Sequence, residues 1–91
     1  MPVMATIKEA TQNAMAFARD SLGAERTAYL QLEEIESAME DGVDVWRITL
    51  SMPDSHPGVF TFVGRRDYKT FAVAKSTGEV LSMRIREMSQ S

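Results

Sequence analysis

The sequence predicts an α+β fold, in which one N-terminal helix packs on a three- to four-stranded antiparallel meander sheet. Apolar residues at helical spacing occur near the start of the chain. Alternation of apolar and polar residues dominates the second half, as in half-buried strands. The stretch Tyr68–Glu87 has the strongest hairpin pattern, because two alternating runs flank a turn at Ser76-Thr77-Gly78.

Length and composition indicate a single folded domain, residues 1–91. A chain of 91 residues cannot divide its apolar side chains between two self-sufficient cores. A content of 44% hydrophobic and 25% charged residues is too apolar for a disordered chain. Because a small domain buries a modest fraction of its surface, a homodimer or a protein partner is a natural supplement.

Composition also excludes several classes of site and partner. The sequence contains no cysteine, which excludes disulfides, thiolate zinc sites and cysteine nucleophiles. A net charge of −3 gives no overall attraction for a polyanion, so we expect no nucleic-acid partner. The N-terminus lacks a secretory pattern and no stretch reaches membrane-spanning length, so we expect a cytoplasmic protein without membrane contact.

The first element is a helix over Ile7–Leu22. The segment Thr6-Ile7-Lys8-Glu9 matches a capping box, and Gly23 is well placed to end the helix. We expect the small central alanines to let this helix lie close to a sheet. The apolar residues at helical spacing are Ile7, Ala10, Ala14, Phe17, Ala18 and Leu22.

The segment Ala28–Met39 fits either a helix or a strand. Its alternation breaks at Glu33-Glu34, so a strand here needs a bulge or a switch of packed face. We favour the strand, because Asp41-Gly42 is a hairpin turn signal and the chain that follows is extended.

Alternating apolar and polar residues predict that the next segment, Val43–Met52, is a half-buried strand. Trp46 should be a major core residue, on the same face as Ile48, Leu50 and Met52. The stretch Pro53–Asp67 then interrupts the sheet with two prolines and glycines, and loops of this kind often carry function. Within it, Val59–Val63 is a short β-prone run.

The last two strands are Tyr68–Lys75 and Glu79–Glu87. In the first, Phe71 and Val73 share one face, and either face can be the inner one. In the second we expect one parity to face inward and the other outward. The inward residues are Leu81, Met83 and Ile85, and the outward residues are Val80, Ser82, Arg84 and Arg86.

A strand carrying Trp46 in DVWRITLS and a final hairpin FAVAKSTGEVLSM, with Thr77-Gly78-Glu79-Val80 at its turn, resemble the PepSY-type domain of the cystatin-like fold group. The resemblance implies a non-enzymatic module, since many PepSY domains accompany secreted or membrane-bound proteases and are thought to restrain or chaperone them. The sequence departs from this pattern by lacking an export signal and a fused partner domain, and by the insertion Pro53–Asp67. We therefore expect a free-standing cytoplasmic relative, whose task the resemblance does not specify.

His56 and an acidic run are the first candidate sites. His56 could serve as a general base or metal ligand, but no second histidine or cysteine completes a metal set, and an exposed loop histidine is the simpler interpretation.

The acidic run could hold a cation or a basic partner, yet its spacing is not that of a calcium loop. We favour a charged strand edge that blocks aggregation, formed by Glu33, Glu34, Glu36, Glu40, Asp41 and Asp44.

Arginines are the other candidates. Arg84 and Arg86 share a strand face, with Arg47 nearby, and could bind a carboxylate or phosphate. Cross-strand pairing with the glutamates of a neighbouring strand is the alternative that we favour. Arg65 and Arg66, placed in a turn, are a weaker pair of the same kind.

The last candidate is a surface. If the helix covers one sheet face only, the other face forms a mildly apolar site for a second copy or a partner, made of Val45, Thr49, Val80, Tyr68, Thr70 and Ala72.

No catalytic, cofactor or metal constellation emerges from the sequence. We therefore expect a non-catalytic protein-interaction or ligand-binding module that acts through the open sheet face, an edge strand or the loop of residues 53–67. The alternative is a small enzyme or small-molecule carrier with a pocket between helix and sheet, and with His56 or the Arg84 and Arg86 pair at its mouth.

Overall fold

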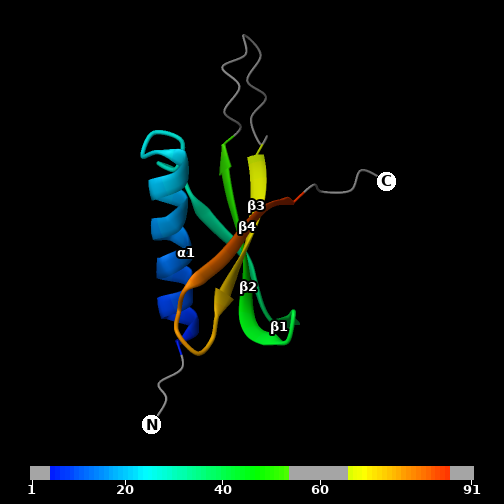
Figure 1. Ribbon diagram of the computed structural model, residues 1–91. Coiled ribbons are helices and arrows are strands. Elements are labelled where there is room, and N and C mark those ends of the chain that lie inside the picture. The colour runs from blue at the N-terminus through cyan, green and yellow to red at the C-terminus, as the bar shows by residue number, and fades with distance from the viewer. Residues whose placement is uncertain (1–4, 54–65, 87–91) are drawn as a thin grey trace, which may run out of the picture.

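The computed structural model describes residues 5–53 and 66–86 and confirms the α+β arrangement. One helix packs on a four-stranded antiparallel sheet in meander order β1-β2-β3-β4, so β1 and β4 are the edge strands (Figure 1). The run Val59–Val63 lies outside the described residues. The elements are α1 (Ile7–Leu22), β1 (Gln31–Glu40), β2 (Val43–Pro53), β3 (Arg66–Ala74) and β4 (Val80–Arg86).

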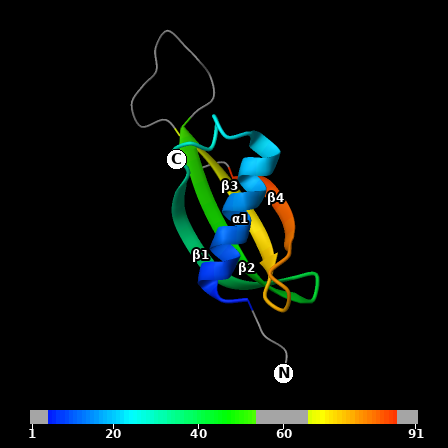
Figure 2. The ribbon, with the colours of Figure 1, turned by 90° about the vertical axis from the view of Figure 1, so that its left-hand side faces the viewer.

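Helix α1 has the predicted bounds and the predicted capping box. The Thr6 hydroxyl accepts from the Glu9 amide at 3.1 Å, and the Glu9 carboxylate accepts from the Thr6 amide at 2.9 Å. Three alanines, Ala10, Ala14 and Ala18, are completely buried against the sheet. Their small size lets α1 lie close across β2, β3 and β4, as Figure 2 shows.

The segment that fitted either a helix or a strand forms strand β1, as the turn that follows it predicted. Its register against β2 shifts between Leu32 and Glu34, which confirms the bulge expected at the break in alternation. Asp41 and Gly42 have φ values of 51° and 80°, and the two positive angles suit the tight turn that joins β1 to β2. The predicted start at Ala28 is wrong, because residues before Gln31 form turns, with the Thr27 hydroxyl donating to the Gly23 carbonyl at 2.8 Å.

The core lies between α1 and the two central strands. Ile48 and Phe71 are cross-strand partners and completely buried, and the Phe17 ring meets the Phe71 ring edge-on with centroids 6.3 Å apart. Trp46 is only partly buried and lies at the margin of this core. Its indole N–H donates to the Ala5 carbonyl at 3.1 Å, and Lys75 Nζ lies 4.3 Å from the ring centroid.

The hairpin of β3 and β4 is confirmed, but the facing of β4 is partly wrong. Its register shifts between Ala72 and Val73, so that Val80 pairs with Val73 and packs against the core instead of facing outward. Leu81, expected inward, is 48% exposed. A bulge adds one residue to a strand, and this residue changes which side chains face the core.

Gly78 closes this hairpin beside α1. It has a φ of 79°, a left-handed backbone conformation that residues with a side chain rarely adopt. Its carbonyl accepts a hydrogen bond from the Asn13 side-chain amide at 2.8 Å, so the flank of α1 that carries Asn13 faces the β3–β4 turn.

Candidate functional site

The candidate arginines lie on three different strands. Arg47 is in β2, Arg66 in β3 and Arg84 in β4. Arg86 belongs to β4 by its backbone, and its side chain lies outside what the structure describes, as do His56 and Arg65. The structure therefore shows the side-chain surroundings of Arg47, Arg66 and Arg84.

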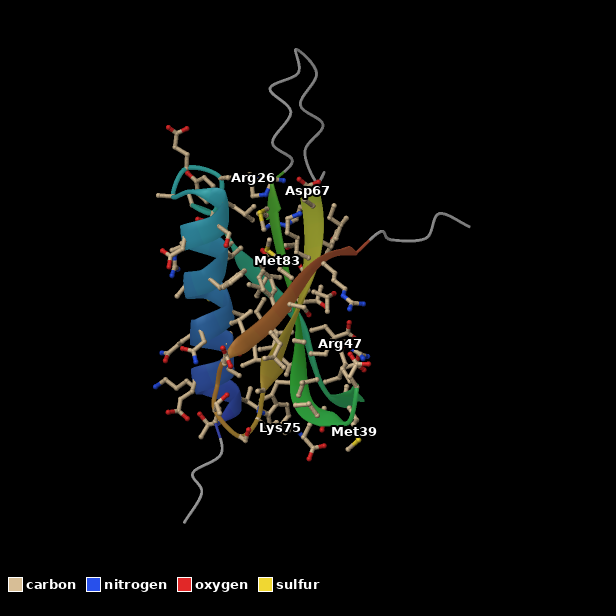
Figure 3. The ribbon with its side chains drawn as sticks, viewed as in Figure 1. Arg26, Met39, Arg47, Asp67, Lys75 and Met83 are labelled. Atoms are coloured by element: carbon tan, nitrogen blue, oxygen red, sulfur yellow. The ribbon has the colours of Figure 1, made fainter. Side chains whose placement is uncertain are left out.

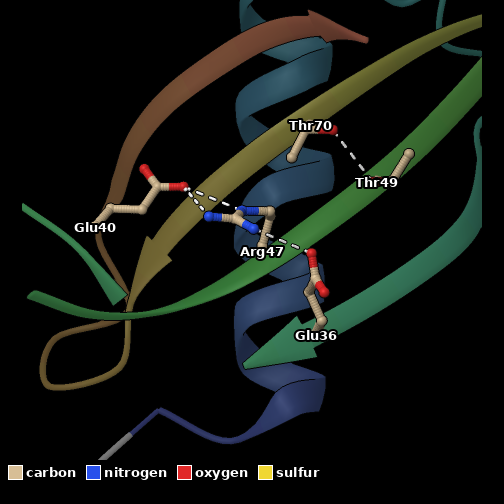
Figure 4. Close-up of polar contacts among 5 residues, drawn as sticks. All are labelled: Glu36, Glu40, Arg47, Thr49 and Thr70. Carbon is tan, nitrogen blue, oxygen red and sulfur yellow. Dashed lines mark hydrogen bonds and ion pairs between the residues drawn. The ribbon is translucent and has the colours of Figure 1, made fainter. Parts of the chain in front are cut away.

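Arg47 points away from α1 and is bound by two glutamates of β1 (Figure 3). Its Nη2 lies 3.0 Å from Glu40 Oε2, and its Nη1 lies 3.2 Å from Glu36 Oε1 (Figure 4). Hydrogen bonds to Glu40 and then to Glu36 hold the pKa of Arg47 above its ordinary value. The cross-strand pairing predicted as the alternative to ligand binding thus holds for Arg47.

Arg66 lies in β3 rather than in the predicted turn, and its donors are also engaged. Its Nε donates to Ser51 Oγ at 2.8 Å, and its Nη2 donates to the Tyr29 carbonyl at 2.8 Å. The Ser51 hydroxyl in turn donates to Glu33 Oε2 at 2.6 Å. Arg66 therefore joins β3 to β2 and to the segment that leads into β1.

We expect Arg66→Met to lower the free energy of unfolding by about 1–3 kcal/mol, because it removes the donor that serves both the hydroxyl and the carbonyl of the buried Ser51. The matched change Arg84→Met should alter it by less than about 0.5 kcal/mol, as for an exposed surface residue. Urea unfolding followed by far-UV circular dichroism measures both. Equal losses in the two variants would contradict the assignment of Arg66 to a structural network.

Arg84 differs from both, since it forms no hydrogen bond or ion pair with the residues that the structure describes. It is exposed and lies opposite Thr70, on the sheet face away from α1. Thr70 is itself engaged with Thr49, with the two hydroxyl oxygens 3.2 Å apart (Figure 4). Strand β3 offers no acidic side chain at this face. The predicted cross-strand pairing with glutamates is therefore not found for Arg84.

Three of the six residues expected to form a mildly apolar open face are buried. Val45 has no exposed surface, and Thr49 and Ala72 are each 3% exposed. Arg47 spans Glu36 and Glu40, the residues that flank Ala38, and Ala38 is the cross-strand partner of Val45. The side chain of Arg47 and its two glutamates thus lie beside Val45, and Val80 lies on the other face.

The acidic residues of β1 are engaged within the protein. Glu33 accepts from Ser51 and Gln31, and Glu36 and Glu40 bind Arg47. Within residues 5–53 and 66–86 there is no group of three or more histidine, cysteine or acidic residues arranged to hold a metal ion. The glutamates are placed as a charged edge strand would be.

Strand β4 exposes apolar side chains that the sequence placed inward. Ile85 is 75% exposed, although Met83, two residues earlier on the same face, packs against the core. Ile85 faces the side that α1 covers and lies opposite Lys69, yet α1 does not bury it. The missed signal is its place at the end of the last strand, where a single helix no longer covers the sheet.

The alternative of a small enzyme or carrier needs a pocket between helix and sheet, and the space between α1 and the sheet is narrow. Ala14 and Ala18 have no exposed surface there, and Phe17 packs on Phe71.

The part of the chain that the structure describes contains no helix with the length and apolar character of a membrane span.

Among the described residues, the candidate features of the edge strand β4 are therefore the unengaged Arg84 and the exposed Ile85. Comparisons with protein-family models, curated proteins and solved structures give no match, so the resemblance to PepSY-type domains stays a prediction and the site is argued from its geometry.

Proposed function

We propose that this protein is a non-catalytic protein-interaction module, which binds an extended segment of a partner protein along the outer edge of β4, where the described residues contribute no neighbouring strand. The observation that carries the proposal is an edge strand with exposed side chains on both of its faces, Ile85 on one and Arg84 on the other. In an antiparallel edge strand, alternate residues direct their N–H and C=O groups away from the sheet. An added strand satisfies these groups by main-chain hydrogen bonds, and the flanking side chains give selectivity.

The opposite edge, β1, is less suited to receive a strand. Both edge strands have a bulge, so the bulge does not separate them, but β1 also has a series of glutamates, several of them engaged with β2. Charged side chains along an edge strand are one of the devices by which proteins protect it against strand addition. The difference between the two edges supports β4 as the binding edge.

The chemistry of the exposed groups favours recognition over catalysis. An arginine stays protonated near neutral pH and therefore supplies donors and charge but no general base. The exposed Ile85 supplies apolar area. A non-enzymatic role also agrees with what the resemblance to PepSY-type domains implies.

A displayed library of random peptides, selected on the immobilised protein, tests this function. We expect the selected peptides to protect backbone amides within Val80–Arg86 from hydrogen exchange, measured by nuclear magnetic resonance, and not those of Gln31–Glu40. Ile85→Asp should abolish binding, while the matched change Met39→Asp, at an exposed methionine of β1, should not. Protection confined to other elements, or no selection at all, would count against the proposal.

A further inference from the structure

The two faces of β4 differ in chemistry near the C-terminal end of the strand. Arg84 lies opposite Thr70 on the face away from α1, and Ile85 lies opposite Lys69 on the other face. A strand added beside β4 therefore meets a basic face and an apolar face in alternation.

The positive charge of Arg84 is not neutralised from within the described residues. The glutamates that bind Arg47 lie on β1, which is separated from β4 by two strands. Strands are spaced by about 4.8 Å, so the two edges are roughly 14 Å apart. This exceeds the screening length of about 8 Å at physiological ionic strength, so the glutamates scarcely offset the charge at β4.

From this charge pattern we infer that the β4 edge selects an acidic segment of another protein. Its carboxylates lie over Arg84, and its intervening apolar side chains lie beside Ile85. The guanidinium fork matches a carboxylate in shape and charge, which gives a short, charge-assisted hydrogen bond. This inference rests on the proposed strand addition and specifies the chemistry of the strand that is added.

A second copy of this chain fits the edge less well. Pairing of β4 with β4 brings the arginines of two copies together, and like charges on facing strands are unfavourable. Pairing of β4 with β1 of another copy is complementary in sign, but Glu33, Glu36 and Glu40 are already engaged with Ser51 and Arg47. Such a head-to-tail contact also leaves a free edge at each end and tends toward open polymers.

Three labelled peptides, each as long as β4, test the inference by fluorescence anisotropy. They carry valine at alternate positions, and glutamate, threonine or lysine at the others. We expect the glutamate peptide to bind about tenfold more tightly than the threonine peptide, and the lysine peptide to bind least. In about 0.5 M NaCl the preference should largely disappear, because salt screens exposed charges.

Charge variants show whether Arg84 is responsible. Arg84→Gln should remove the preference for glutamate over threonine, and Arg84→Glu should reverse it in favour of lysine. Lys8→Glu makes the same change of charge at an exposed position of α1 and should leave the preference intact. Circular dichroism confirms that each variant is folded, so that a loss of binding is not a loss of structure.

The outcomes separate this inference from the proposed function. Equal binding of the three peptides with protection of β4 amides would keep strand addition and overturn the acidic preference. A glutamate preference that survives Arg84→Glu would also overturn it. Absence of binding by all three, together with failure of the library selection, would remove both. Concentration-dependent growth in sedimentation mass that Arg84→Glu abolishes would assign the edge to β1 of a second copy and overturn the choice of a foreign partner.

Discussion

Phe71→Ala should lower the free energy of unfolding by about 3–5 kcal/mol, the usual cost of removing a buried aromatic ring. Phe71 has no exposed surface, lies opposite Ile48 in β2 and holds the Phe17 ring of α1 edge-on. Its removal therefore leaves a cavity at the centre of the contact between helix and sheet. Domains of this size are stable by about 5–15 kcal/mol, so the variant should be partly unfolded at modest urea concentrations.

Urea unfolding followed by far-UV circular dichroism and by the fluorescence of Trp46, the sole tryptophan, measures the loss. Ile85→Ala is the matched control, because it also truncates an apolar side chain of the last two strands but at a position 75% exposed. It should change stability by less than about 0.5 kcal/mol. A loss below about 1 kcal/mol for Phe71→Ala would mean that the core is centred elsewhere.

Features that depend on neighbouring residues were predictable from the sequence. The capping box of Thr6 and Glu9, the turn at Asp41-Gly42 and the bulge at Glu33-Glu34 each follow from a few adjacent side chains. The hairpin of β3 and β4 was predictable for the same reason, since its turn ends in a glycine with positive φ. Local steric and hydrogen-bonding preferences act over short stretches, which a sequence displays directly.

The facing of β4 was not predictable, because it depends on the register between two strands. The shift between Ala72 and Val73 turns Val80 to the core. Nothing in the alternation from Glu79 onward marks this shift, since Val80 and Leu81 are both apolar. The exposed Ile85 was missed for a related reason, because the length of sheet that one helix covers is a tertiary property.

The candidate arginines also look alike in the sequence, since Arg47 and Arg84 both alternate with apolar residues. Strand order separates them: Arg47 adjoins the glutamates of β1, and Arg84 adjoins Thr70. Arg66 was placed in a turn and is instead the link between three segments. For His56, which lies outside the described residues, the exposed loop position expected from the sequence stays a prediction.

Ala14→Leu should lower the free energy of unfolding by about 1–3 kcal/mol, because the larger side chain overpacks the contact between α1 and the sheet. Ala14 is the middle of the three fully buried alanines that let α1 approach the sheet. A leucine there must displace α1 or force neighbouring core side chains such as Phe71 from their preferred rotamers. If buried apolar area alone decided stability, the larger leucine side chain would raise the free energy of unfolding, so the two expectations have opposite signs.

Ala16→Leu, at an exposed position of the same helix, separates packing from helix propensity. Leucine and alanine are both good helix formers, so this control should stay within about 0.5 kcal/mol of the parent. Thermal and urea unfolding of the two variants give the comparison. If Ala14→Leu unfolds at the same urea concentration as Ala16→Leu, α1 has room to move without cost, and the close approach of helix to sheet does not hold the fold together.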